Sequence, residues 1–219
     1  QQDESIEPDI RRLVGDQAEI LVTRVPSGDE VTPETLAAME DHLEGAAVLL
    51  PSAARFSVIG YACTSGAAQI GPARVASILQ QTTGAPQASD PTSALIAACR
   101  AMGITRLGLL SPYVPEVSAR IQTVLGDAGI ETPVFGSFNV AEEARVVRID
   151  AASIRDAAVQ LAQDGGIEAV FMSCTNLRTL DLIAPLEAEL GLPVLSSNQV
   201  LAWHMSRLAG TELAPGDWG

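Results

Sequence analysis

Two stretches of sequence, SVIGYACTSG (Ser57–Gly66) and AVFMSCTNLR (Ala169–Arg178), decide the fold of this chain. Each reads as an apolar strand that ends in Cys-Thr and is followed by small or polar residues suited to opening a helix. Cys63 and Cys174 lie 111 positions apart, about half of the 219-residue chain. The spacing and the shared pattern predict two similar lobes related by a pseudo-twofold axis.

Apolar runs alternate with segments of helical periodicity on both sides of these stretches. Runs typical of buried parallel strands are Glu19–Val25, Phe56–Tyr61, Arg106–Leu110, Thr132–Phe135, Ala169–Met172 and Pro193–Ser196. Helical spacing marks Pro33–Leu50, Pro72–Gln81, Ser93–Met102, Pro115–Ala128, Ser153–Gln163, Thr179–Leu190 and Gln199–Leu208. The alternation predicts an α/β fold of two Rossmann-like or flavodoxin-like lobes with parallel sheets and helices on both faces.

The lobes are expected to meet at two hinge segments, Gln87–Pro91 and Leu195–Asn198. Residues 1–90 and 199–219 then form an N-terminal lobe with Cys63, and residues 91–198 form a C-terminal lobe with Cys174. We expect the active site in the cleft between the lobes.

The sequence also leads to an expectation for the structure at each end of the chain. The tail Leu213–Gly219 contains Pro and Gly and reads as a surface end, after a final helix that returns to the first lobe. Gln1-Gln2-Asp3 has no apolar run ahead of it. We therefore expect that the sequence begins inside the fold and that a strand belongs ahead of Gln1.

The composition narrows the class of protein and its partners. Hydrophobic residues make up 47% of the chain and aromatic residues 4%, which is typical of a folded α/β protein rather than a disordered one. The formal net charge of −14 and the lack of any basic cluster argue against nucleic acid as a partner. An acidic surface repels anions, so a carboxylate ligand would need local donors such as backbone N–H groups at helix ends.

The sequence has no run of about 18 apolar residues and no basic segment followed by an apolar one at its start. We therefore expect a cytoplasmic protein with no membrane partner. Its three cysteines, Cys63, Cys99 and Cys174, match neither a disulfide framework nor a zinc pattern. We therefore expect all three cysteines to be reduced thiols.

Cys63 and Cys174 are the candidates for chemistry. Ligands of parallel α/β sheets bind beyond the carboxyl ends of the strands, where both Cys-Thr pairs lie. A helix N-terminus stabilises a thiolate, which makes such a cysteine a nucleophile or base near neutral pH. A single strand-end cysteine is about as often a small buried hydrophobic residue, but two at matching places favour a functional pair. Cys99, inside a helical segment among Ala and Ile, reads as structural.

Four motifs carry a family resemblance: YACTSG from Tyr61, LSPYVPEVS from Leu110, SCTNLR from Ser173 and PVLSSNQ from Pro193. Together they resemble the Asp/Glu racemase superfamily, and within it the maleate cis-trans isomerases and their relatives from ectoine utilisation. The resemblance implies a cofactor-independent isomerase or racemase of a small carboxylate or amino-acid-like molecule. It implies no metal and no pyridoxal phosphate. It also implies that the chain assembles as a homo-oligomer, either a dimer or a tetramer.

The same resemblance implies that Cys63 is the nucleophile or first acid/base and that Cys174 is its partner on the opposite face of the substrate. In the isomerases a thiolate adds to the double bond of maleate, the single bond rotates, and elimination gives fumarate. In the racemases one thiolate removes the α proton and the opposed thiol delivers another. Both reactions need two thiols on opposite faces of one carbon skeleton.

Further residues are candidates for binding the substrate. Thr64, Ser65, Thr175 and Asn176 follow the cysteines and are suited either to binding a carboxylate or to capping a helix. Tyr113 stands where the resemblance implies a substrate-contacting tyrosine, and its alternative is a half-buried core residue.

The sequence departs from the isomerases at two places where they carry a substrate-binding Asn. Asp3 and Glu143 align with these positions. A carboxylate only accepts hydrogen bonds, so both residues would repel a dicarboxylate. We therefore expect a substrate with a cationic or N–H-rich group, such as a cyclic amidine or diamino acid from ectoine breakdown. The alternative for Glu143 is an exposed, salt-bridged helix start.

Other functions stay open. One is an enzyme like the arylmalonate decarboxylases of the same superfamily, another is a non-catalytic ligand-binding protein, and a third is a thiol redox protein, which would prefer a C-x-x-C pair. His204, beside Trp203, reads as a packing or surface residue and Asn198 as a helix cap.

Overall fold

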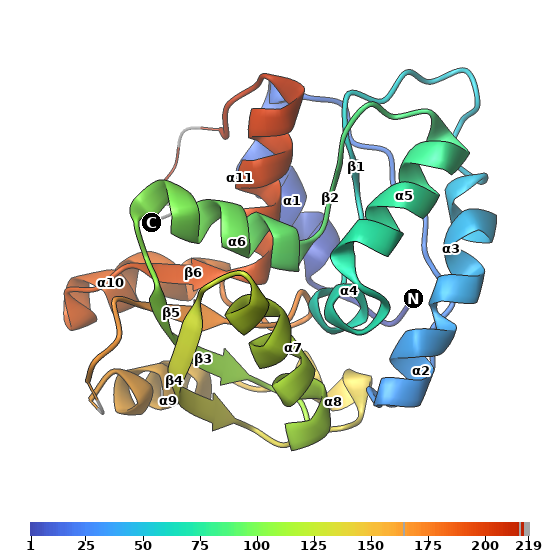
Figure 1. Ribbon diagram of the computed structural model, residues 1–219. Helices are drawn as coiled ribbons and strands as arrows, with labels where there is room; N and C mark the ends of the chain where they lie inside the picture. Colours follow the sequence, from blue (N-terminus) through green and yellow to red (C-terminus); the bar gives the residue numbers. More distant parts are fainter. Residues whose placement is uncertain (164, 215, 217–219) are drawn as a thin grey trace.

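The computed structural model describes residues 1–163, 165–214 and 216 (Figure 1). It confirms the α/β fold with parallel sheets. The first sheet pairs β1 (Ile59–Gly60) with β2 (Ala88–Ser89). The second contains β3 (Arg106–Ser111), β4 (Glu131–Ser137), β5 (Ala169–Met172) and β6 (Val194–Ser196), all parallel, in the order β4-β3-β5-β6.

The strand order of the second sheet fixes where a ligand can bind. The chain passes from β3 outward to β4 and then crosses to β5 on the other side of β3, as in flavodoxin-like sheets. The crevice between the carboxyl ends of β3 and β5 is therefore the switch point of the sheet. Tyr113 follows β3 and Cys174 follows β5, so both predicted site residues lie at that crevice.

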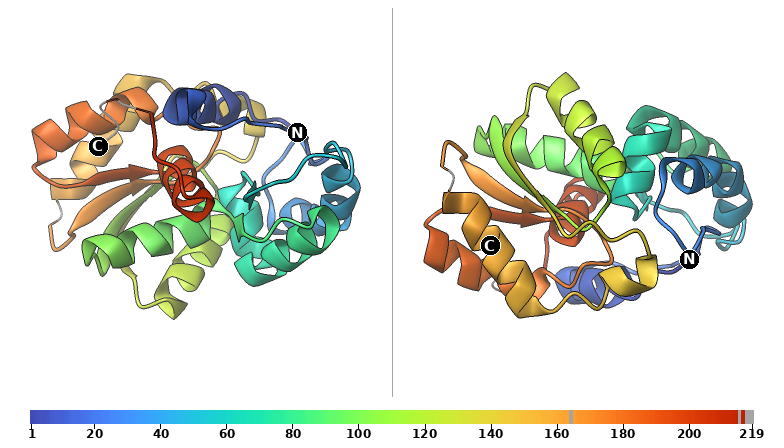
Figure 2. Two further views of the ribbon diagram at one scale, coloured as in Figure 1. Left: turned by 90° about the horizontal axis from the view of Figure 1, so that it is seen from above. Right: turned by 90° about the horizontal axis from the view of Figure 1, so that it is seen from below.

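Helices cover both faces of the second sheet, which explains its nearly continuous apolar strands. Figure 2 shows α6 (Pro91–Met102) and α7 (Pro115–Asp127) on one side and α9 (Ala151–Gln163) and α10 (Ile183–Leu190) on the other. Leu109 and Phe171, in the middle of the sheet, are completely buried. The predicted helices here match the structure to within a few residues.

The first lobe contains α1 (Ile6–Val14), α2 (Pro33–Ala38), α3 (Glu40–Ala47), α4 (Thr64–Ile70) and α5 (Pro72–Thr83). The last helix, α11 (Ser197–Ala209), packs against α6, α1 and both strands of the first sheet. It therefore contacts elements on both sides of the predicted division, and its return to the first lobe stays a prediction. The division into 1–90 with 199–219 and 91–198 stays a prediction.

Several sequence predictions are wrong in detail. Glu19–Val25 pairs with no other strand in the described part of the chain, and Phe56–Tyr61 keeps only the two residues of β1. The helix predicted over Pro33–Leu50 is interrupted at Met39, where hydrogen bonds tighten to the i to i−3 spacing. The segment Thr179–Leu190 begins as a short 3₁₀ helix, Leu180–Leu182, ahead of α10.

The ends of the chain are described only in part. Within the predicted surface end Leu213–Gly219, residues 215 and 217–219 lie outside the described residues. Ala214 donates its backbone N–H to the carbonyl of Leu13, at 2.7 Å, so the tail touches α1 there. Among the described residues no helix combines the length and apolar character that crossing a membrane requires.

Candidate active site

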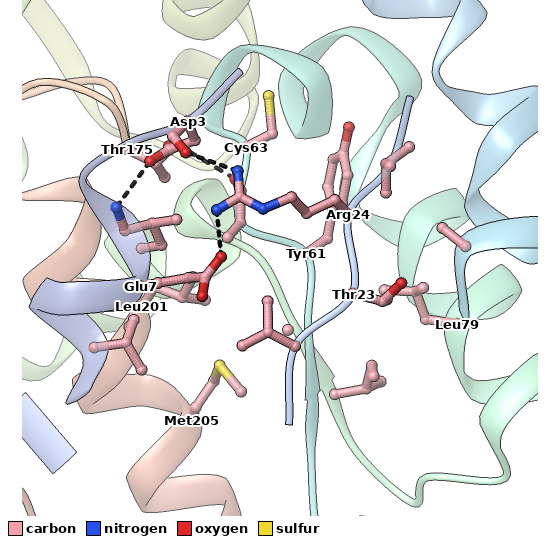
Figure 3. Close-up of a pocket in the computed structure, with 18 of the residues that line it drawn as sticks. Asp3, Glu7, Thr23, Arg24, Tyr61, Cys63, Leu79, Thr175, Leu201 and Met205 are labelled. Carbon is pink, nitrogen blue, oxygen red and sulfur yellow. Dashed lines mark hydrogen bonds and ion pairs between the residues drawn. The ribbon is translucent and has the colours of Figure 1, made fainter. Parts of the chain in front are cut away.

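A cavity of about 710 Å³ brings most of the predicted site residues together. Its polar end is lined by Asp3, Cys63, Ser65, Tyr113, Glu143, Cys174 and Thr175. Figure 3 shows Asp3, Cys63 and Thr175 at one end, with Leu201 and Met205 towards the other. Thr64 and Asn176 lie behind this wall, and both are almost completely buried.

Cys63 lies at the N-terminus of α4, as the sequence predicts. It is the N-cap residue, and its Sγ accepts the backbone N–H of Gly66 at 3.3 Å. The hydroxyl of Ser65 lies 3.7 Å from the same sulfur. The helix end therefore supplies one backbone donor and one hydroxyl to the Cys63 thiol.

Cys174 is held differently, because no helix begins directly after it. The residue has a φ of 127°, in the region that favours glycine, and the chain turns at Thr175 and Asn176. Its Sγ accepts the backbone N–H of Asn176 at 3.3 Å. The helix predicted to open after this motif is replaced by a tight turn, with strain at the cysteine itself.

Ser197, at the start of α11, joins the two Cys-Thr motifs. Its Oγ accepts the Thr64 hydroxyl at 2.8 Å and the backbone N–H of Cys174 at 3.0 Å. The hydroxyl of Thr175 in turn donates to the carbonyl of Ala62 at 3.4 Å. The two motifs are thus bonded to each other across the lobes. Sequence reasoning missed Ser197 because the S-S-N segment reads locally as a helix start.

Burial governs the protonation of both thiols. It raises the pKa of Cys63, with the negative charges of Glu143 and Asp3 adding to the effect and the Gly66 N–H opposing it. Burial also holds the pKa of Cys174 well above its ordinary value, with Glu143 adding to the effect. The predicted helix-end stabilisation is present but outweighed, so both thiols carry their protons at neutral pH when the pocket is free of ligand.

Each thiol has a buried tyrosine for a neighbour. Tyr113 is 2% exposed, and its hydroxyl hydrogen-bonds to Cys174; burial holds its pKa well above 10. Tyr61 is 5% exposed, and burial raises its pKa in the same direction, with Cys63 adding to the effect. Both phenols are therefore neutral donors. Tyr61 was missed as a site residue, although it stands two positions before Cys63 in the Y-A-C motif.

Glu143 is the carboxylate whose charge acts most strongly on the two thiols. It opens α8 (Glu143–Val146), and one carboxylate oxygen accepts the side-chain N–H of Asn176 at 2.8 Å. Burial raises the pKa of Glu143, and the charge of Asp3 raises it further. The amide oxygen of Asn176 accepts the backbone N–H of Glu4 at 2.8 Å. Asn176 therefore positions Glu143 with one end of its amide and the N-terminal segment with the other.

Asp3 makes different hydrogen bonds from Glu143. Its Oδ1 accepts the backbone N–H groups of Ser5 and Ile6, both at 2.8 Å, at the start of α1. Arg24 donates to the carbonyl of Asp3 at 2.8 Å and pairs with Glu7, as Figure 3 shows. Both carboxylates line the pocket, but Asp3 is bonded to the start of α1 whereas Glu143 is bonded to Asn176.

The sequence model of the arylmalonate decarboxylase family matches residues 27–218 of the chain. The chain belongs to this family. Among its relatives, an arylmalonate decarboxylase of Bordetella bronchiseptica is 30% identical over 135 residues, which span 60% of this chain and 55% of the decarboxylase. A maleate isomerase of Geobacillus stearothermophilus is 29% identical over 174 residues, 76% of this chain and 69% of the isomerase.

A solved structure of the family agrees with the fold. A Nocardia farcinica maleate cis-trans isomerase, a Cys-to-Ser mutant with a covalently bound succinylcysteine intermediate, superposes with a TM-score of 0.86 at 25% identity, covering 96% of this chain and 89% of the isomerase. The resemblance to the Asp/Glu racemase superfamily and to maleate isomerases is confirmed, and so is the two-lobe fold. Because decarboxylases and isomerases both belong to the family, membership leaves the reaction type open.

The side chains of Asn198, His204 and Cys99 do not line this cavity. Asn198 is not the cap of α11, since Ser196 is; its amide instead donates to Asp9 at 2.8 Å and to the carbonyl of Thr175 at 2.9 Å. His204 lies 2.8 Å from the Ser89 hydroxyl, and Cys99 is buried in α6. Across residues 1–163, 165–214 and 216, no group of three or more His, Cys, Asp or Glu side chains is placed to hold a metal ion.

Proposed function

We propose that the protein is a cofactor-independent isomerase or racemase of a small carboxylate, worked by Cys63 and Cys174. The observation that carries this proposal is the joining of the two Cys-Thr motifs through Ser197, with both thiols at the wall of one pocket. The succinylcysteine of the Nocardia isomerase supports a thiol that bonds covalently to the substrate in this family.

The two thiols are suited to reversible addition or to proton exchange. In the first case one sulfur, as thiolate, adds to an alkene carbon while the neighbouring carbon gains a proton; rotation and loss of the same thiolate and a proton give the isomer. In the second, one thiolate takes the α proton and the opposite thiol donates its own proton to the other face. Neither route changes the oxidation state of the substrate overall.

Neutral donors surround the place where a substrate carboxylate would lie. The backbone N–H groups after Cys63 and Cys174 and the hydroxyls of Ser65, Thr175 and Tyr113 can donate to it without adding a fixed charge. We propose that Thr64 contributes through its backbone N–H, because its hydroxyl already donates to Ser197. Asn176 contributes by positioning, because its backbone N–H is bonded to Cys174 and its amide to Glu143.

Glu143 points to the class of substrate. Its negative charge raises the pKa of both thiols, and a dicarboxylate would add further charge of the same sign. An ammonium or amidinium group beside Glu143 would cancel that charge, and the pKa of the thiols would then fall when the substrate binds. We therefore propose an amino-acid-like or amidine-bearing carboxylate, a class that includes ectoine-derived acids, over maleate.

Proton exchange tests the proposed reaction. The protein is incubated in deuterated water with maleate, aspartate, glutamate and ectoine-derived acids, and label or isomerisation is followed by NMR. We expect turnover of at least one compound and its loss in both Cys63→Ala and Cys174→Ala. Exchange that persists in either folded variant would refute the two-thiol mechanism. Binding of a compound without any exchange would support a non-catalytic binding protein.

The substrate class has its own test. Glu143→Gln removes the charge but keeps the hydrogen-bond geometry, and we expect the ratio of kcat/KM for cationic over dicarboxylate substrates to fall by at least about tenfold. Glu142→Gln is the matched control, because Glu142 is exposed and paired with Arg145 outside the pocket. Equal ratios in both variants would contradict the proposed substrate class while leaving the two-thiol mechanism untouched.

A decarboxylase is the second candidate, and the match to the Bordetella enzyme favours it. Such an enzyme would release carbon dioxide from an arylmalonate and protonate the resulting carbanion with a cysteine. Arylmalonates in the same NMR assay distinguish the two candidates. Formation of an arylacetate, with no label exchange into the other compounds, would replace the isomerase proposal.

A further inference from the structure

The backbone of Cys174 has a conformation that residues other than glycine disfavour. Its φ is 127°, whereas Cys63, at the matching strand end, is extended with a φ of −152°. A positive φ of this kind costs a residue with a side chain free energy, and it persists only where surrounding contacts hold it. The contacts on either side of Cys174 therefore indicate what sets the direction of its thiol.

The backbone N–H of Cys174 is bound by a side chain where a strand carbonyl would be expected. Val170 donates its N–H to the carbonyl of Pro193, on the side of β5 that faces β6. In a parallel ladder the donors on one side recur at every second residue, so Cys174 would meet the carbonyl of Ser197. The chain leaves the sheet at this point, because α11 begins at Ser197. The Ser197 hydroxyl oxygen takes the place of the carbonyl and accepts the Cys174 N–H at 3.0 Å.

The next residue of α11 binds the other end of the same turn. The side-chain amide of Asn198 donates to the carbonyl of Thr175 at 2.9 Å and to a carboxylate oxygen of Asp9, in α1, at 2.8 Å. Ser197 and Asn198 are both completely buried, so water does not compete for these hydrogen bonds. Two consecutive residues of one helix thus fix the backbone on both sides of the strained cysteine.

Cys63 is positioned by different means. Its sulfur accepts the backbone N–H of Gly66 at 3.3 Å, and its carbonyl accepts the backbone N–H of Ala67 at 2.9 Å. Both donors belong to α4, the helix that Cys63 itself caps. Bonds to residues close in sequence therefore position Cys63, whereas the first turn of α11, more than twenty residues further along the chain, positions Cys174.

We propose that Ser197 is a positioning residue for the reaction: it holds Cys174 in its positive-φ conformation, with Asn198 in support, and so directs the thiol towards the substrate. In this conformation the sulfur lies at the pocket wall and accepts the N–H of Asn176 at 3.3 Å. Relaxation to an ordinary φ would turn the side chain away from that place. The role in the reaction rests on the proposed two-thiol function, but the hold on the Cys174 backbone does not.

Nuclear magnetic resonance reports the conformation of Cys174 directly. The three-bond coupling between the amide and α protons is small at a φ of 127° and large in extended backbone. We expect a small coupling in the parent protein and a clear rise in Ser197→Ala, where exchange of the Cys174 amide should also speed up at least about tenfold. The Ser173 amide, which donates to the carbonyl of Leu110 at 2.8 Å, should exchange as before.

Two further variants serve as controls. Ser173→Ala also removes one buried serine hydroxyl beside Cys174, but this hydroxyl has no hydrogen-bond partner in the described part of the chain. Thr64→Val removes the hydroxyl that donates to Ser197 and leaves the Ser197 oxygen in place. We expect both variants to keep the small coupling and the slow amide exchange of Cys174.

Steady-state kinetics tests the consequence for the reaction. Ser197→Ala should lower kcat at least about tenfold and change KM less than about threefold, because a misdirected thiol impairs the chemical step more than binding. Ser173→Ala should keep both constants. The inference is overturned if Ser197→Ala retains the parent coupling, if Thr64→Val changes it as much, or if kcat is unaffected by the changed conformation. The expected change of coupling in a protein that turns over no compound would instead refute the proposed function and confirm the hold on Cys174.

Discussion

At the scale of single residues, the carboxylate of Glu143 shares a pocket with both cysteine thiols, and its charge raises the pKa of each. Glu143→Gln removes that charge, so the thiol pKa values fall and more thiolate is present at a given pH. We expect alkylation of Cys63 by iodoacetamide at about pH 8 to speed up by about three- to tenfold. Mass spectrometry measures the rate at each cysteine.

Glu142→Gln controls for the change in total charge. Glu142 is exposed and lies outside the pocket, so its variant should react like the parent protein. Equal acceleration in both variants would show that net charge, rather than the position of Glu143, sets the thiol pKa. Slower alkylation in Glu143→Gln would contradict the sign of the effect.

Cys174 combines a candidate catalytic side chain with a strained backbone. Its φ of 127° is easily adopted by glycine and costs other residues free energy. We expect Cys174→Gly to have a free energy of unfolding about 1 kcal/mol higher than Cys174→Ala, while neither supports turnover. Urea denaturation of the two variants measures the difference. Equal stability would mean that the backbone at this position relaxes when the thiol is removed.

At the scale of elements, the N-terminus of α4 depends on the absence of a side chain at Gly66. A Cβ there would lie 2.5 Å from the Tyr61 hydroxyl and 3.0 Å from the Cys63 sulfur. We expect Gly66→Ala to reduce the free energy of unfolding by about 1–3 kcal/mol and to lower kcat by displacing the thiol.

Gly45→Ala in α3 is the matched control for Gly66→Ala. A Cβ at this exposed position meets no atom within 4 Å, so Gly45→Ala should raise the free energy of unfolding by about 0.5–1 kcal/mol with kcat unchanged. Chemical denaturation measures the free energy of unfolding of both variants, and steady-state kinetics measures their kcat. A neutral Gly66→Ala would show that Tyr61 moves aside without cost.

For two segments of the chain the local sequence pattern is not sufficient to predict the secondary structure. Glu19–Val25 has the composition of a strand, yet a strand exists only when a neighbour supplies hydrogen bonds, and the described chain supplies none there. The SCTNLR motif looks like a helix opening, but its backbone turns because Asn176 is tied to both Glu143 and Glu4. In both cases a contact distant in sequence decides the local structure.

At the scale of the whole molecule, buried carboxyls and a net charge of −14 set the response to pH. Burial raises the pKa of Asp9, Asp90 and Glu143 above 3.8, 3.8 and 4.5, their ordinary values. Just above these ordinary values the three carboxyls are therefore still protonated in the folded state but ionised in the unfolded state. This difference adds to the free energy of unfolding, and the added part is lost as the pH rises through the pKa values of the folded state. The carboxyls with lowered pKa, such as Glu168 and Asp181, are mostly exposed and screened.

We accordingly expect a higher urea midpoint at about pH 5.5 than at about pH 8. Asp90→Asn should flatten this dependence, because Asn caps a helix as well as Asp and does not titrate. A midpoint that is equal or higher at pH 8 in the parent protein would contradict the argument.

The sequence by itself determined the alternation of strands and helices, the α/β class and the two Cys-Thr strand ends. These features follow from periodicity and from residue types that act over a few neighbouring positions. The position of Cys63 at a helix N-terminus was predictable for the same reason.

Only the tertiary structure decided how these parts act together. It joined the motifs through Ser197, set Tyr61 beside Cys63, and bonded Asp3 to the start of α1 but Glu143 to Asn176. It also reversed the expected shift of the thiol pKa, because burial and a charge brought close by folding outweigh the local helix end. Desolvation and charge interactions depend on distances in space, which the order of residues along the chain does not contain.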